Sequence, residues 1–115
     1  MNKERLLKLA THLRQEKLPI DWDFGTIVNE CGTAGCALGN CQFVWPNDWD
    51  TASFGYFLMF NKAGIWFNLT YGDTHALFDI DDGHLRARMK LPHCGSYLTA
   101  LQVAENIENF VENYE

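Results

Sequence analysis

The stretch K-E-R-L-L-K-L-A-T-H-L-R-Q-E-K, residues 3–17, carries the clearest structural signal in this chain. Its apolar residues recur at intervals of three and four: Leu6, Leu9, Ala10 and Leu13. This spacing places them on one face of an α-helix. Asn2 is a suitable N-cap, and Pro19 disfavours helical backbone at the residue before it. The pattern predicts a helix over residues 3–17.

A second amphipathic helix is expected over residues 99–114, where Thr99 and Gln102 have the spacing of a capping box. Its apolar face would consist of Ala100, Val103, Ala104, Ile107, Phe110, Val111 and Tyr114. The charged residues of this segment are all acidic, whereas residues 1–17 hold five basic and two acidic residues. Opposite charge therefore predicts that the two terminal helices pack together.

The middle of the chain gives weaker signals. Thr33 is placed to cap a short helix that would run to Phe43 or Val44. Residues 53–60 are apolar nearly all round, so they predict a buried segment without deciding between helix and strand. We expect Asn61-Lys62-Ala63-Gly64 to interrupt it.

Thr70 and Asp73 resemble another capping box, which predicts a helix through Phe78. After the turn signal Asp81-Asp82-Gly83, Leu85, Ala87, Met89 and Leu91 alternate with His84, Arg86, Arg88 and Lys90. Alternation is the period of a strand with one solvated face. The prediction is a mainly α fold, a single domain over residues 1–115, with a short extended element near 84–91; the alternative is α+β.

Residues 31–41, C-G-T-A-G-C-A-L-G-N-C, form the most distinctive motif. Together with Arg5–Leu13, Trp66–Thr70, Leu77-Phe78 and the segment 99–111, it resembles a family of small, mainly helical proteins of bacteria and their phages. That family is recognised by a C-G-T-x-x-C-A-L-G core. The resemblance implies a helical fold and a phage or mobile-element origin, and it implies no reaction.

The composition sets several function classes aside. A formal net charge of −6 argues against general affinity for nucleic acid or anionic membranes, which needs clustered basic residues. No apolar run approaches the ~20 residues of a membrane span, and no secretion signal is apparent after Met1. Four cysteines in such a chain are expected as reduced thiols in the cytoplasm.

A metal site and a cofactor are not expected. Structural zinc ligands usually come in C-x2–4-C pairs, whereas Cys31, Cys36 and Cys41 are each separated by four residues, and the fourth cysteine is Cys94. An EF-hand beginning at Asp79 would lack its acidic fifth and twelfth ligands. Buried cysteines and a solvated turn explain these residues better.

Cys36 is the candidate nucleophile, because a thiol in the first turn after a Thr33 cap would have a lowered pKa. The alternative is small-residue packing, in which Gly35 and Gly39 let another helix approach closely. This alternative is favoured, because a catalytic thiol also needs exposure and a base.

Two features support binding. Trp22, Trp45, Trp49 and Trp66 could line a pocket or a partner surface, although core filling is the simpler interpretation. Arg86, Arg88 and Lys90 would point the same way from an extended segment and contact a phosphate or carboxylate, unless they only protect a sheet edge.

The sequence thus favours a small cytoplasmic, non-enzymatic accessory protein of phage type that binds another protein. A binder of a small anionic, nucleotide-like ligand is the alternative, and a cysteine enzyme is the third hypothesis. The oligomeric state is left open.

Overall fold

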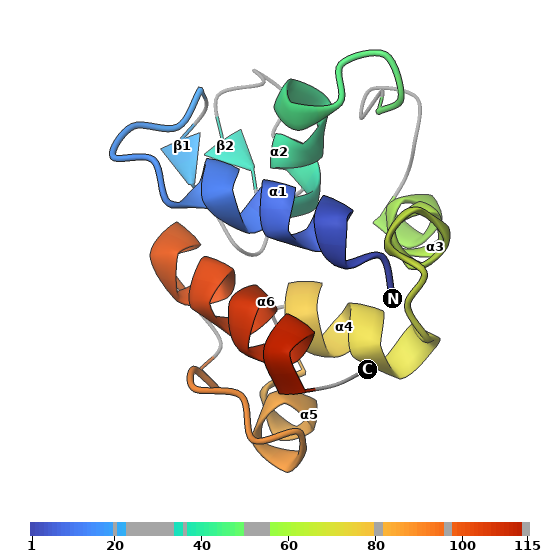
Figure 1. Ribbon diagram of the computed structural model, residues 1–115, viewed down its shortest axis with the longest axis vertical. Coiled ribbons are helices and arrows are strands. Elements are labelled where there is room, and N and C mark those ends of the chain that lie inside the picture. The colour runs from blue at the N-terminus through green and yellow to red at the C-terminus, as the bar shows by residue number, and fades with distance from the viewer. Residues whose placement is uncertain are drawn as a thin grey trace.

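The fold is built mainly from α-helices, as the sequence predicts (Figure 1). The computed structural model describes residues 1–19, 21–22, 34–35, 37–49, 56–79, 82–95 and 98–113. Its elements in chain order are α1 Lys3–Leu13, β1 Asp21–Trp22, β2 Ala34–Gly35, α2 Ala37–Val44, α3 Tyr56–Phe67, α4 Tyr71–Phe78, α5 Gly83–Arg88 and α6 Ala100–Asn113.

The two terminal helices pack against each other along most of their length, which confirms the prediction from their charges. In Figure 1, α1 crosses the centre of the molecule and α6 runs beside it in the opposite direction. Helix α2 covers the other side of α1, while α3 and α4 lie toward the N-terminal end of α1. The longest amphipathic segments therefore organise the whole fold.

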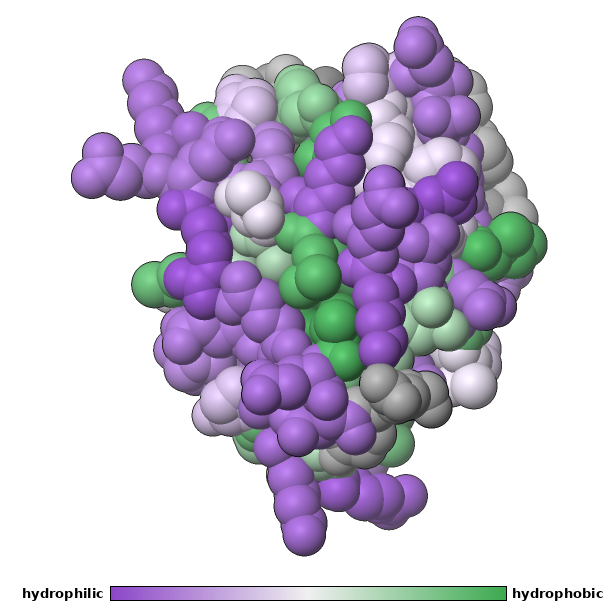
Figure 2. Space-filling model, in the orientation of Figure 1, coloured by the Kyte–Doolittle hydropathy of each residue, from purple (hydrophilic) through white to green (hydrophobic). Residues whose placement is uncertain are grey.

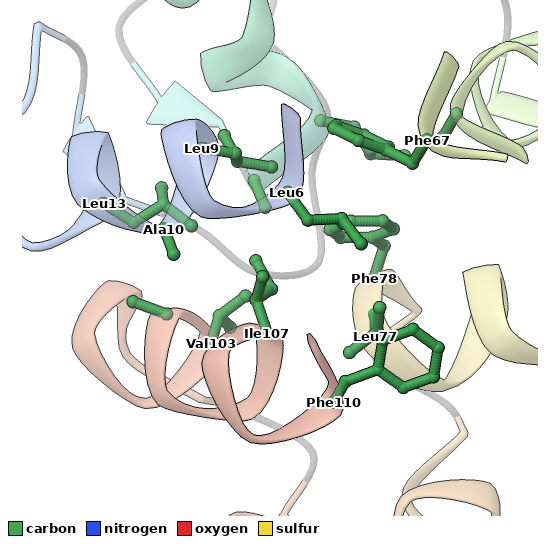
Figure 3. Close-up of a cluster of buried hydrophobic side chains, with 14 of the residues drawn as sticks. Leu6, Leu9, Ala10, Leu13, Phe67, Leu77, Phe78, Val103, Ile107 and Phe110 are labelled. Carbon is green, nitrogen blue, oxygen red and sulfur yellow. The ribbon is translucent and has the colours of Figure 1, made fainter. Parts of the chain in front are cut away.

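The core forms where the apolar faces of α1, α4 and α6 meet (Figure 3). Leu6 of α1 points toward Phe78 of α4, and Ala10 and Leu13 lie on the side of α1 that faces Val103 and Ile107 of α6. These side chains are excluded from solvent. At about 1.5–3 kcal/mol for each buried large apolar side chain, this contact is the main source of stability.

Helix α1 begins as expected but is four residues shorter than predicted. The Oδ1 atom of Asn2 accepts a hydrogen bond from the Arg5 N–H at 3.1 Å, which is an N-cap. The helix ends at Leu13, because residues 14–17 bring no apolar side chain to bury. At the other terminus, Thr99 and Gln102 form the predicted capping box.

The helix expected from Thr33 begins later, at Ala37. Ala34 and Gly35 belong instead to β2, which pairs in parallel with Asp21–Trp22. Gly35 therefore does not share a helical face with Gly39, so that part of the small-residue interpretation is wrong. Thr33, Cys31 and Cys36 lie outside the described residues.

For residues 53–60 the sequence did not decide between helix and strand. The structure contains a helix, α3, from Tyr56 onward. The expected interruption at residues 61–64 is wrong, because they continue the helix. It ends instead at Asn68, whose φ of 54° is left-handed. The Leu69 N–H bonds to the Gly64 carbonyl at 2.8 Å, and the Asn68 N–H bonds to Ile65. This is a Schellman ending, with asparagine in the place usually taken by glycine.

Residues 84–91 do not form the expected extended element, because Gly83–Arg88 is the helix α5. The prediction assumed that every charged residue faces water, but Arg86 is fully buried and Ala87 is exposed. The helix closes with a second left-handed residue, Lys90, at φ 58°. The Leu91 N–H then bonds to the Arg86 carbonyl at 3.0 Å.

Hydrophilic side chains cover most of the face shown in Figure 2, around a narrow apolar strip at its centre. A further group of hydrophobic side chains is exposed at the edge of this face, over α3. Within the described ranges, no helix combines the length and hydropathy needed to cross a lipid bilayer.

Candidate functional site

Three of the four tryptophans form an aromatic cluster rather than an open site. Trp45 and Trp49 each meet Trp66 edge to face, with ring centroids 5.5 and 6.4 Å apart. The guanidinium of Arg5 covers Trp66 at 3.6 Å from its ring centroid. Trp22 lies elsewhere, and its Nε1 donates to the Leu98 carbonyl at 2.7 Å. The cluster is therefore consistent with core filling.

The three basic residues expected to share a binding face are separated by the helix α5. Arg86 is fully buried, whereas Arg88 and Lys90 are exposed. The Arg86 guanidinium donates to the carbonyls of Ala76, Asp79 and Gly95 at 3.2, 2.5 and 2.8 Å. Burial lowers the pKa of this guanidinium, and the nearby Asp82 opposes that shift. Arg86 joins α4, α5 and the following loop, so it is a structural cation.

The cysteines that the structure describes offer no catalytic arrangement. Cys41 is buried in α2, and its thiol contacts the Ala37 carbonyl at 3.5 Å. Cys94 is exposed, and its thiol contacts the Leu91 carbonyl at 3.3 Å. Cys36, the candidate nucleophile, lies outside the described residues, so its role stays a hypothesis.

A pocket of about 440 Å³ lies between α3 and α4, at a place that the sequence did not indicate. The Schellman ending at Asn68 turns the chain, and Thr70 begins α4 by accepting a hydrogen bond from the Asp73 N–H at 3.2 Å. The two helices thereby face each other across the pocket. Its lining consists of Phe60, Asn61, Gly64, Ile65, Asn68, Leu69, Tyr71, Thr74 and His75.

His75 contributes the imidazole of this pocket, and its ring is contacted from several sides. Its ring stacks on Phe60 with centroids 4.6 Å apart and contacts Tyr71 at 4.2 Å. Its Nδ1 lies 2.8 Å from Asp79 and 3.4 Å from Asp82. Two carboxylates beside Nδ1 favour the tautomer with its proton on that nitrogen, which leaves Nε2 as an acceptor.

Such a histidine has the orientation of a general base, but a base alone does not make an active site. The described residues of the lining carry two hydroxyl groups, those of Tyr71 and Thr74, and the Thr74 hydroxyl donates to the Thr70 carbonyl at 2.8 Å.

The same residues include the one group with metal-ligand character that the described part of the chain contains. Ligand atoms of His75, Asp79 and Asp82 lie within 4.8 Å of one another. Nitrogen and carboxylate ligands of this kind suit Zn²⁺ or a related ion. However, the positive charge of Arg86 already interacts with both carboxylates, and its guanidinium donates to the backbone carbonyl of Asp79.

A second hollow of about 460 Å³ lies on the other side of the turn between α3 and α4. It is lined by Met1, Asn68, Leu69, Thr70, Asp73, Phe110 and Asn113. None of its described lining residues is a buried polar side chain comparable to His75. The pocket at His75 is therefore the stronger candidate.

One sequence signal could have indicated this pocket. Tyr71, His75 and Asp79 are spaced four residues apart, so they follow one face of the helix that Thr70 was expected to begin. Comparison with protein-family models, with curated proteins and with solved structures finds no match to the chain.

Proposed function

We propose that this protein is a non-enzymatic binding domain and that the pocket between α3 and α4 receives a side chain from a partner protein. The observation that carries this proposal is the exposure of two large apolar residues at the pocket. Ile65 is 83% exposed and Tyr71 is 74% exposed, and both belong to the lining. Large apolar residues around a concave site are typical of docking surfaces.

The chemistry of the lining indicates what kind of partner would fit. Among the residues that the structure describes, no aspartate, glutamate, lysine or arginine lines the pocket. A charged side chain would lose its water there without finding an opposite charge, which is unfavourable. Asn61, Asn68 and Thr74 add polar groups to the apolar part of the lining. An uncharged anchor that combines apolar surface with a hydrogen-bonding group is the occupant that this lining supports best.

A role for a small anionic ligand has less support. The basic residues on which that alternative depended are not part of the lining, and Arg86 is bound to backbone carbonyls. The accessory role of phage type, implied by the resemblance in the cysteine-glycine core, agrees with a binding domain and is retained as part of the proposal.

Selection from a random peptide library tests the proposal. We expect the selected peptides to share one uncharged anchor residue and to perturb backbone NMR signals of α3 and α4. Ile65→Glu should weaken their binding by about tenfold or more, the loss typical of a central anchor contact. Leu101→Glu is the matched control, because Leu101 is also an exposed apolar helix residue, on α6.

Peptides that bind Ile65→Glu and the parent equally well would contradict the proposal. The same conclusion would follow if selected peptides perturbed α6 and left α3 and α4 unchanged.

A further inference from the structure

We infer that the occupant of the pocket is an aromatic side chain with an N–H or O–H donor, tyrosine or tryptophan, and that it donates to Nε2 of His75. This inference rests on the proposed function, because it names the chemistry of the group that the partner inserts. The observation behind it is a largely buried imidazole in the pocket lining whose Nε2 has no hydrogen-bond partner among the described residues.

His75 is only 7% exposed, so its ring is almost entirely removed from bulk water. Within the described part of the chain, its hydrogen-bond and ion-pair contacts all involve Nδ1. Nε2 has no hydrogen-bond partner there, although His75 belongs to the pocket lining. Nε2 is not among the buried atoms that lack a partner, so it is open to solvent. An occupant that excludes this water has to donate a hydrogen bond in its place, because an acceptor that loses water without gaining a donor is costly.

Asp79 and Asp82 determine which hydrogen bond Nε2 can make. Both carboxylates lie beside Nδ1, so the proton of the neutral ring belongs on that nitrogen. Nε2 then carries a lone pair and accepts. The stacked Phe60 ring and Tyr71 limit rotation of the imidazole, so this acceptor has a fixed direction.

The rest of the lining favours a flat, uncharged group. Phe60, Leu69 and Tyr71 supply apolar and aromatic surface, on which a ring packs edge to face or offset. A volume of about 440 Å³ is ample for one aromatic side chain and part of its backbone. Phenylalanine or leucine would fill the apolar part and leave Nε2 unpaired. Tyrosine and tryptophan satisfy both requirements.

Small-molecule surrogates of these side chains test the inference directly. The probes are p-cresol with 4-methylanisole, and 3-methylindole with 1,3-dimethylindole. Within each pair, methylation removes the donor hydrogen and retains the ring. Binding is followed at pH ~8 through the backbone NMR signals of Gly64, Leu69 and His75.

We expect each donor-bearing probe to bind about three- to tenfold more tightly than its methylated counterpart, as one net hydrogen bond predicts. In His75→Phe, which retains the flat ring but has no acceptor, that preference should disappear. A preference caused only by the size of the added methyl group would survive this substitution, and that result would overturn the inference.

Asp79→Asn provides a second test that retains the imidazole. It removes the charge that holds the proton on Nδ1, so the preference for the donor-bearing probes should shrink at least about twofold. An unchanged preference in this variant, or equal affinity within each pair for the parent protein, would overturn the inference. If no probe shifts the signals of α3 and α4, the proposed function itself fails.

Discussion

Arg14, directly after α1, donates to both carboxylate oxygens of Glu108 on α6, with Nε 2.8 Å from Oε2. This pair is the specific contact behind the charge complementarity of the two terminal helices. The hydrogen bonds from Arg14 lower the pKa of Glu108, and the pKa of Arg14 is raised in return. A bidentate geometry makes this contact directional as well as electrostatic.

The first prediction concerns the pH dependence of stability through this pair. Because the pKa of Glu108 is lower in the folded protein, its stabilising contribution is present above the unfolded value of about 4.3 and is lost as pH falls through the folded pKa. Glu108→Gln should therefore lower the urea midpoint of unfolding at neutral pH. At acidic pH the midpoints of the variant and the parent should become equal.

Glu112→Gln is the control, since it removes the same charge from an exposed position on α6. The difference for Glu108→Gln should also shrink in high salt, because the pair is exposed. A difference that stays constant from neutral to acidic pH would contradict the prediction.

The second prediction concerns Arg86, whose guanidinium joins α4, α5 and the loop at Gly95. Arg86→Met should lower the free energy of unfolding by about 3–5 kcal/mol, because it leaves buried carbonyls and acidic neighbours without their cation. Arg86→Lys should also be destabilising, since an ammonium group cannot reproduce the planar fork.

Arg88→Met tests whether this effect belongs to the buried position. Arg88 is exposed, so its replacement should change stability by about 0.5 kcal/mol or less in urea unfolding. Equal effects at the two positions would show that Arg86 is not the structural cation described above.

The third prediction concerns Asn106, a fully buried polar residue on the inner face of α6. Its Oδ1 accepts from the His93 N–H at 3.0 Å, and its Nδ2 donates to the His93 carbonyl at 2.8 Å. Asn106→Leu would leave both backbone groups unpaired and should cost about 2–4 kcal/mol in urea unfolding. Asn113→Ala, at the exposed end of the helix, should cost about 0.5 kcal/mol or less. Similar losses for the two variants would argue against an anchoring role for Asn106.

Regular patterns in the sequence predicted the terminal helices and their contact. Leu6, Leu9 and Leu13 have helical spacing, and Asn2 and Thr99 are capping residues whose hydrogen bonds the structure contains. Local sequence patterns are sufficient to predict these two helices, because one face of each is apolar and the other is charged. The short middle helices are not amphipathic in this way.

The errors occur where a tertiary contact overrides a local rule. The alternating pattern predicted a strand because it treated Arg86 as a residue that faces water. Arg86 is buried instead, because carbonyls from two other segments accept hydrogen bonds from its guanidinium. Gly64 does not end α3, because the chain turns at Asn68 and Leu69 returns to bond with Gly64. The pocket forms because α3 and α4 face each other. The sequence of either helix alone does not predict that arrangement.

The fourth prediction is that the fold forms without a metal ion. His75, Asp79 and Asp82 could supply three ligands, but Arg86 already balances part of their negative charge. Treatment with EDTA should leave the thermal midpoint unchanged. A thermal midpoint that falls with EDTA and recovers with Zn²⁺ would contradict the prediction. Loss of that response in Asp82→Asn would then show that the ion binds at His75, Asp79 and Asp82.

The last prediction compares two helical glycines that should respond to alanine with opposite sign. At Gly72 in α4, an added Cβ would have no neighbouring atom within 4 Å, so Gly72→Ala should stabilise by up to about 1 kcal/mol through helix propensity. At Gly83 in α5, the Cβ would lie 2.6 Å from the Cys94 carbonyl oxygen.

That oxygen belongs to the backbone of the segment that Arg86 holds at Gly95, so it cannot move aside without disturbing that contact. Gly83→Ala should therefore cost about 1–3 kcal/mol despite the gain in helix propensity. Urea unfolding of both variants measures the two signs. If Gly83→Ala were as stable as Gly72→Ala, the loop at Cys94 would not be packed against the start of α5, and the position of Arg86 between them would have to be revised.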